Sequence, residues 1–195
     1  MSAEVTIVLL AAGASTRMRG ADKMLEPLGD ATLLRVMAGR AQKAGALRVV
    51  IPQGNTARAQ ALEGLSCDIV TVPAGQGMSA SLKAGTQGVT GPVLIVLADM
   101  PEVTAHDMHL MIALSRQAPR AILRAAAQDG TPGNPVLFPA DLLPDLQTIK
   151  GDKGARDLLK RHAARVHLIP LPGQNALTDL DTPEDWASWR ATPRK

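Results

Sequence analysis

Residues 5–18 have the sequence VTIVLLAAGASTRM, in which a short apolar run leads directly into a loop of small residues. The run from Val5 to Leu10 is rich in β-branched side chains and predicts a buried strand. Small residues after a strand let backbone N–H groups approach a ligand closely. Arg17, and Lys23 a little further on, bring two cations to the same edge. Amide donors and cations at the end of a strand suit a polyphosphate, so we expect a nucleotide to bind here.

The composition limits the class of protein. A chain of 195 residues with 46% hydrophobic and 20% charged residues predicts a single globular domain over residues 1–195. Aromatic residues make up only 2%, and the scattered charges sum to +3, which disfavours nucleic-acid partners. Cys67 is the sole cysteine, so a reducing compartment fits. No run has the length of a signal peptide or a membrane span, and we expect a cytoplasmic protein without membrane partners.

Strand-like and helix-like segments alternate along most of the chain. The patterns predict strands at residues 5–10, 47–51, 68–72, 92–97 and 121–126, and helices at 31–44, 56–62, 77–84 and 104–115. Such alternation predicts an α/β fold with a mostly parallel sheet between helical layers, in which ligands bind at the carboxyl ends of the strands. The regularity weakens at residues 127–150, where Gly and Pro are dense, and this segment could form a lid or a small, irregular β insertion.

The loop of small residues after the first strand is not one of the two common phosphate loops. Only Gly13 follows the first strand, so the dinucleotide pattern G-x-G-x-x-G is absent, and no Gly-Lys-Ser/Thr run exists. An ordinary strand-to-helix turn would explain the small residues alone. It would not explain two cations in the same turn region, Arg17 and Lys23, which favour a ligand.

A carboxylate follows the most apolar predicted strand. Asp99 lies in the motif LADMP, residues 97–101, where its oxygen ligands suit Mg²⁺. A helix cap is the alternative role, but Pro101 and Thr104 already serve the start of the next helix.

The motif DLDTPED, residues 179–185, contains a second group of acids. Thr182 before a proline, with Asp185 three residues on, predicts a capped helix start. Helix capping leaves Asp179 and Asp181 unexplained, and one of these could complete a metal site shared with Asp99.

Three further motifs are less specific. In GQGMSASL, residues 75–82, Ser79 or Ser81 could cap a helix, or the helix start could contact a base or ribose. Residues 130–138 predict a turn entering a strand. Residues 151–156 predict a turn entering a helix, where Lys153 and Arg156 could bind an anionic second substrate or simply be solvated.

Together these motifs resemble the molybdenum cofactor nucleotidyltransferases over nearly the whole chain. The segments that carry the resemblance are LAAGASTRM with Lys23, GMSASL, LADMP, GNPVLF, GDKGAR and DLDTPED. The resemblance implies a three-layer, Rossmann-like nucleotidyltransferase fold. The cytidylyltransferase branch is the more similar one, because its guanylyl relative typically has two glycines where Ala12-Gly13 stands and lacks the G-M-S-x-S-L form.

The resemblance also implies roles for single residues. Those expected to bind the nucleotide are Leu10, Ala11, Ala12, Gly13, Arg17, Lys23, Ser79 and Asp99. Among these, Arg17 and Lys23 would act in catalysis, and Asp99 with Asp181 would hold Mg²⁺. The chain departs from the family pattern at Arg19, where Gly is usual, and at Asn134, where His is often found.

The expected reaction is Mg²⁺-dependent transfer of CMP from CTP to the phosphate of molybdopterin, with release of pyrophosphate. A molybdoenzyme could receive the finished cofactor. Three alternatives remain open: a guanylyltransferase using GTP with the same acceptor, a cytidylyltransferase acting on a sugar or polyol phosphate, and a non-catalytic nucleotide-binding accessory protein for molybdenum hydroxylase maturation.

Overall fold

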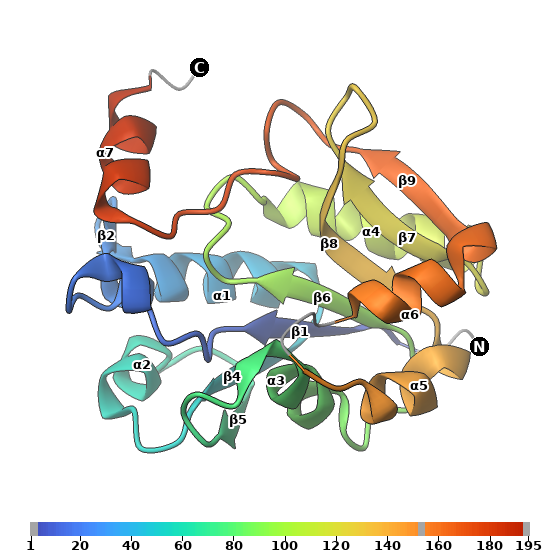
Figure 1. The fold of residues 1–195 in the computed structure, drawn as a ribbon, viewed down its shortest axis with the longest axis horizontal. Helices are drawn as coiled ribbons and strands as arrows, with labels where there is room; N and C mark the ends of the chain where they lie inside the picture. The colour runs from blue at the N-terminus through green and yellow to red at the C-terminus, as the bar shows by residue number, and fades with distance from the viewer. Residues whose placement is uncertain (1–3, 152–154, 193–195) are drawn as a thin grey trace.

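A computed structural model describes residues 4–151 and 155–192, which form a central sheet with helices on both faces (Figure 1). The strands of this sheet are β1 (Thr6–Leu10), β4 (Ala46–Pro52), β5 (Asp68–Val72), β6 (Val93–Leu97), β7 (Ile122–Ala126), β8 (Pro132–Phe138) and β9 (Val166–Pro170). Their order is β5-β4-β1-β6-β8-β7-β9, and every neighbouring pair is parallel except the two that involve β8. The predicted three-layer α/β fold with a mostly parallel sheet is confirmed.

The helices are α1 (Leu33–Ala44), α2 (Thr56–Ala61), α3 (Gly77–Thr86), α4 (Ala105–Gln117), α5 (Leu143–Thr148), α6 (Arg156–Arg161) and α7 (Pro183–Ala191). Buried side chains of α1 and α4 pack on one face of the sheet, and those of α3, α5 and α6 pack on the other. Thr104 caps α4, as predicted, and its contacts with Asp107 complete a capping box. No helix among the described residues has the length and apolar character needed to cross a membrane.

The strand β1 lies inside the sheet, between β4 and β6, and is buried on both faces. Ile7 and Leu9 belong to the core under α1 and α4, whereas Val8 and Leu10 belong to the core under α3 and α5. Because successive side chains of a strand point to opposite faces, a continuous apolar run is what a central strand with helices on both sides requires. The buried strand predicted at residues 5–10 is thus confirmed.

The segment 127–150 does not form a lid or a separate β insertion. Its residues Pro132–Phe138 make β8, which enters the main sheet antiparallel between β6 and β7, and α5 follows. The buried side chains Val136, Leu137 and Phe138 explain this position, because a strand at the sheet interior must bury both its faces.

The small antiparallel β element lies elsewhere in the chain. It is the hairpin of β2 (Pro27–Leu28) and β3 (Ala31–Thr32). Because Ala31 and Thr32 belong to this hairpin, α1 begins two residues later than the pattern suggested.

Candidate active site

A cleft of about 560 Å³ opens where the loops after β1, β5 and β6 meet. Seven of the residues predicted to bind nucleotide or metal line it, namely Leu10, Ala12, Gly13, Arg17, Lys23, Asp99 and Asp181. The cleft lies at the carboxyl ends of parallel strands, which is where ligands bind in open α/β sheets. The opposite wall is the start of α3, where Gly77, Met78 and Ser81 face the cleft.

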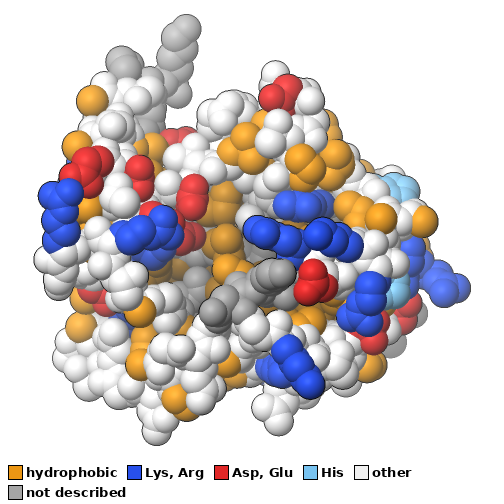
Figure 2. Space-filling view, in the orientation of Figure 1, with side chains coloured by type: hydrophobic (Ala, Val, Ile, Leu, Met, Phe, Trp, Pro, Cys, Tyr) orange, Lys and Arg blue, Asp and Glu red, His pale blue; other side chains and the backbone are white. Residues whose placement is uncertain are grey.

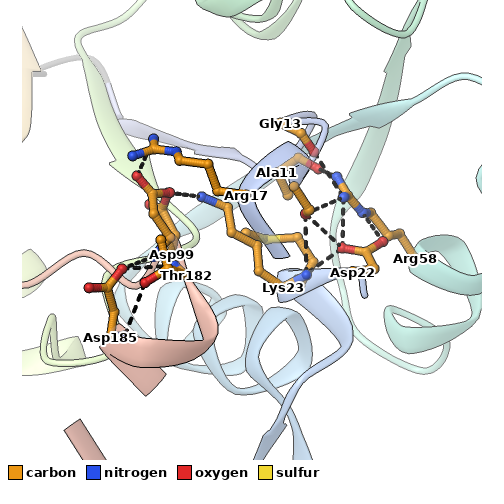
Figure 3. Close-up of polar contacts among 12 residues, drawn as sticks. Ala11, Gly13, Arg17, Asp22, Lys23, Arg58, Asp99, Thr182 and Asp185 are labelled. Carbon is orange, nitrogen blue, oxygen red and sulfur yellow. Dashed lines mark hydrogen bonds and ion pairs between the residues drawn. The ribbon is translucent and has the colours of Figure 1, made fainter. Parts of the chain in front are cut away.

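Lys23 lies between two carboxylates that come from distant parts of the chain. Its Nζ donates to Oδ2 of Asp99 at 2.5 Å and to Oδ1 of Asp181 at 2.6 Å (Figure 3). Lys23 starts a short 3-10 turn and is only 7% exposed. Burial alone would lower the pKa of Lys23, but the adjacent Asp99 and Asp181 outweigh burial and raise it. The ammonium therefore stays charged at neutral pH.

Asp181 is held in place by the start of α7. The backbone N–H groups of Asp181 and Thr182 both donate to the carboxylate of Asp185, while the Thr182 hydroxyl accepts from the Asp185 N–H. Leu180 donates its N–H to the Asp99 carbonyl at 3.0 Å, which ties this loop to the end of β6. The capping roles predicted for Thr182 and Asp185 are confirmed, and capping also orients the neighbouring acid.

The cleft concentrates opposite charges at one end. Arg17 donates from Nη2 to Oδ2 of Asp181 at 2.5 Å, although 68% of the Arg17 side chain is exposed. Asp179 lines the same end, where burial and then the like charges of Asp181 and Asp99 raise the pKa of its carboxyl. A multivalent ligand that carries both cationic and anionic groups, such as a metal-bound polyphosphate, matches this arrangement.

The carboxylates of Asp99 and Asp181 suit a magnesium ion whose remaining ligands are water and nucleotide phosphate. No group of three His, Cys, Asp or Glu side chains suited to a metal occurs within the described ranges. Asp99 and Asp181 nevertheless converge on the same ammonium group. Mg²⁺ commonly takes one or two carboxylates and fills its remaining positions with water and substrate phosphate. A pair of acids is therefore a sufficient donor set for that ion.

Arg58 on α2 is a residue of the site that the sequence motifs did not indicate. It is 2% exposed, and its guanidinium donates to the carbonyls of Ala11 at 2.5 Å and Gly13 at 2.9 Å. It also forms a two-pronged ion pair with Asp22, from Nε at 2.8 Å and from Nη2 at 2.7 Å (Figure 3). Arg58 therefore positions the loop after β1 against the turn that presents Lys23.

Two residues predicted to bind the nucleotide do not line the cleft. The Ala11 side chain is buried, its N–H donates to the Val50 carbonyl, and its own carbonyl accepts from Arg58. Ser79 and Ser81 are both buried on α3, but only Ser81 lines the cleft. The helical repeat of 3.6 residues decides which serine faces the cleft, and that rotation is set by the packing of α3 on the sheet.

Arg19, which stands where the family motif usually has glycine, adopts a left-handed backbone conformation with φ of 53°. Glycine enters that region without a steric cost, whereas other residues do so rarely. The Arg19 guanidinium forms an ion pair with Glu184 on α7, so the Arg19 side chain links the loop after β1 to the last helix. Asn134, the second departure, lies on β8 and lines a neighbouring cleft. Lys153 lies outside the described residues.

Comparison with known proteins places these features in a family. Residues 7–166 match the family model described as MobA-like NTP transferase domain. The chain belongs to this family. Molybdenum cofactor guanylyltransferase from Serratia proteamaculans is 28% identical over 97% of the chain and 96% of its own length. Nicotine blue oxidoreductase from Paenarthrobacter nicotinovorans is 30% identical over 92% of the chain and 93% of its own length.

Other similar proteins match over different extents. Purine catabolism protein PucB from Bacillus subtilis is 30% identical over 57% of the chain, which is about half (54%) of the PucB length. Among solved structures, Rv0371c from Mycobacterium tuberculosis superposes with a TM-score of 0.85, 28% identity and coverage of 98% of this chain and 100% of the other. That protein is also known as a complex with manganese, which superposes with a TM-score of 0.78 at 26% identity, covering 96% and 98% of the two chains.

Proposed function

We propose that this MobA-like NTP transferase moves CMP from CTP to the terminal phosphate of molybdopterin and releases pyrophosphate. The observation that carries the proposal is Lys23 Nζ, which lies between Asp99 and Asp181 at the end of a cleft bordered by the loop after β1. The full-length similarity to a molybdenum cofactor guanylyltransferase supports the acceptor. The Ala12-Gly13 pair and the GMSASL motif support CTP as the donor.

In the proposed reaction an oxygen of the acceptor phosphate forms a bond to the α-phosphorus of CTP, and the bond from that phosphorus to pyrophosphate breaks. The attacking phosphate is already anionic near neutral pH, so no side chain has to remove a proton. Catalysis then depends on alignment and on neutralising the charge that develops on the leaving group. Arg17 and Lys23 are the cations of the chain that are placed to do this.

The acids have the complementary task. Asp99 and Asp181 would hold Mg²⁺, which when bound supplies positive charge to the triphosphate. In the structure these carboxylates are neutralised by Lys23 and Arg17. The two cations are therefore already at the triphosphate end of the cleft when the nucleotide arrives. Manganese in a family member of the same fold is consistent with a divalent ion in this one.

Transfer of GMP from GTP to the same acceptor is the second candidate, because a full-length relative is named as a guanylyltransferase. A sugar or polyol phosphate as acceptor would use the same cleft. A nucleotide-binding accessory protein would not need the two acids, and their presence beside Lys23 disfavours that role. The proposal also includes a molybdoenzyme that receives the finished cofactor. It includes a cytoplasmic location, which the single cysteine supports.

The proposal is tested by pyrophosphate release from each of the four ribonucleoside triphosphates, with and without molybdenum-loaded pterin, in the presence of Mg²⁺. We expect release only when the pterin is present, and fastest with CTP. Preference for GTP would identify a guanylyltransferase. Release that requires a sugar or polyol phosphate instead would replace the acceptor, and nucleotide binding without any release would rule out the transfer reaction.

A further inference from the structure

A second cleft of about 730 Å³ adjoins the nucleotide cleft. The two share Met78 and Leu97, so they are continuous at the end of β6. Apolar side chains from the sheet and from α6 form much of the lining, including Val136 and Phe138. Met78 is 41% exposed, which is unusual for a large apolar side chain and leaves it available to a ligand in either cleft.

Three cations line this second cleft: Arg124 from β7, and Arg156 and Lys160 from α6. None of the described residues that line it is Asp or Glu, and none of the three cations forms an ion pair with a carboxylate of the described ranges. Figure 2 shows Lys and Arg side chains gathered near the middle of this face. Cations that converge on a hollow without acids in its walls mark a site for an anion.

Arg124 is held in place rather than free in solvent. Its Nε donates to the Gly133 carbonyl at 3.0 Å, which fixes the guanidinium over β8. Burial, together with repulsion from Arg156, lowers the pKa of Arg124. An anion bound between the two guanidinium groups would relieve both effects, because it replaces lost hydration and offsets the repulsion.

The register of the sheet gives the separation between Arg124 and the strand that leads to the site of transfer, measured across the sheet. Ile95 on β6 pairs with Val136 on β8, and Val136 pairs on its other side with Arg124 on β7. Arg124 is therefore two strand spacings from β6, about 10 Å. Leu97 and Asp99 end that strand, and they border the nucleotide cleft.

We propose that the acceptor carries a second anionic group, on the far side of β8 from its attacking phosphate, and that Arg124, Arg156 and Lys160 bind this group. The body of the acceptor lies between the two anionic ends, over the apolar side chains of β8. Arg124 and Lys160 are thus specificity-determining residues for the acceptor. The inference rests on the proposed nucleotidyl transfer for the position of the reacting phosphate, but not for the presence of the anion site.

The test compares two simple probes, hexane-1,6-diyl bisphosphate and hexyl monophosphate, which differ in the second phosphate. Their binding to the full chain is measured by titration calorimetry, with Mg²⁺ and the α,β-methylene analogue of CTP filling the first cleft. We expect the bisphosphate to bind tenfold to hundredfold more tightly, as hydrogen bonds to charged groups predict. Equal affinities of the two probes in the unmodified protein would overturn the proposal.

Variants identify the residues responsible. Arg124→Gln and Lys160→Gln should remove most of the advantage of the bisphosphate and leave the affinity for the CTP analogue unchanged. The Lys160 side chain is exposed and forms no hydrogen bond or ion pair with the described residues. Its variant therefore remains informative if Arg124→Gln does not fold. Arg161→Gln, the adjacent cation of α6 that faces away from the cleft, is the matched control. An equal loss in Arg161→Gln would refute the assignment.

The two proposals fail separately. If the bisphosphate advantage depends on Lys160 but no nucleoside triphosphate yields pyrophosphate, then the anion site stands and the transfer reaction is wrong. If pyrophosphate release proceeds with the pterin while the two probes bind equally, then the reaction stands and the second anion site is wrong.

Discussion

At the scale of single residues, charged side chains in the site join parts of the chain that are far apart. Arg58 bonds to Ala11, Gly13 and Asp22, which are 47, 45 and 36 positions away from it in the sequence. Lys23 bonds to Asp99 and to an acid 158 positions away. Because these groups are largely buried, loss of one partner leaves the other without compensation, so single substitutions should have large effects.

Asp22→Asn tests the ion pair with Arg58 through its pH dependence. Although burial opposes it, the Arg58 guanidinium lowers the pKa of the Asp22 carboxyl below the ordinary value of 3.8. A lowered pKa in the folded state means that the pair stabilises the protein above pH 3.8 and that this contribution disappears as the pH falls through the lower value. We expect the substitution to reduce the free energy of unfolding by about 1–3 kcal/mol at pH 7 and by progressively less below pH 3.8.

Urea unfolding of both proteins across this range measures the difference. Asp30→Asn, which changes an exposed carboxylate in the nearby hairpin, is the matched control. A cost for Asp22→Asn that is the same at pH 3 and pH 7 would contradict the lowered pKa.

Lys23→Ala tests the central cation of the proposed active site. We expect a fall in turnover of about a hundredfold or more, because a donor aimed at developing charge in a water-poor site contributes on that scale. Lys23→Arg keeps the positive charge but replaces the compact ammonium with a planar guanidinium, so its turnover should lie between those of the unmodified protein and Lys23→Ala. Steady-state pyrophosphate release measures all three, circular dichroism checks the fold, and Lys43→Ala on the exposed face of α1 is the control. Normal turnover in a folded Lys23→Ala protein would remove Lys23 from the mechanism.

At the scale of elements, α3 connects the two clefts to the sheet. Its first turn presents Met78 and Ser81 to the nucleotide cleft, and its last turn packs closely on β1 and β4. Gly85 makes this close packing possible, because a Cβ at that position would lie 2.4 Å from Cγ1 of Val8 and 2.9 Å from Cγ2 of Val50. The position of the cleft wall thus depends on the absence of one methyl group.

Two Gly→Ala substitutions separate close packing from helix propensity. Gly85→Ala should lower the free energy of unfolding by about 1–3 kcal/mol, because the added methyl overpacks the interface. Gly39→Ala on α1 meets nothing within 4 Å and should raise the free energy of unfolding by about 0.4–1 kcal/mol. Chemical denaturation measures both, and equal effects of the two substitutions would contradict the structure.

At the scale of the whole molecule, both ends of the chain build one site. The helix α7 lies beside the hairpin of β2 and β3 (Figure 1), where Arg190 donates to Glu26 at 3.1 Å and to the Pro27 carbonyl at 3.1 Å. Arg19 and Glu184 make a second link between the same regions. A ligand that contacts the loop after β1, the end of β6 and Asp181 should therefore stabilise the molecule as a unit.

Thermal unfolding with nucleotide tests this. Mg²⁺ and CTP at a hundredfold excess over the dissociation constant should stabilise the folded state by about 2.7 kcal/mol, which for a chain of this size raises Tm by about 5–10 °C. The shift should disappear with EDTA and in Asp181→Asn. A larger shift with GTP than with CTP, at equal excess, would reverse the donor assignment, and a shift that is insensitive to EDTA would remove the metal from the site.

Much of the fold and part of the site follow from local sequence patterns. The alternation of strands and helices, the buried strand before the small-residue loop, and the capping boxes at Thr104 and Thr182 all depend on residues within a few positions of one another. The position of Asp99 at the site could be predicted because Asp99 follows a buried strand, and the carboxyl ends of parallel strands meet at the edge of the sheet where ligands bind. Position along the chain was sufficient for these features.

The remaining features depend on contacts between distant residues. The antiparallel entry of β8, the contacts of Arg58 with the loop after β1, the placement of Ser81 instead of Ser79 in the cleft wall, and the three cations of the second cleft were decided only when the sheet assembled. The physical reason is that a local pattern specifies which faces of an element are apolar, whereas strand order and helix rotation are set by how all the apolar faces are buried together. Side chains of the site that are 36 to 164 positions apart acquire their partners in that step.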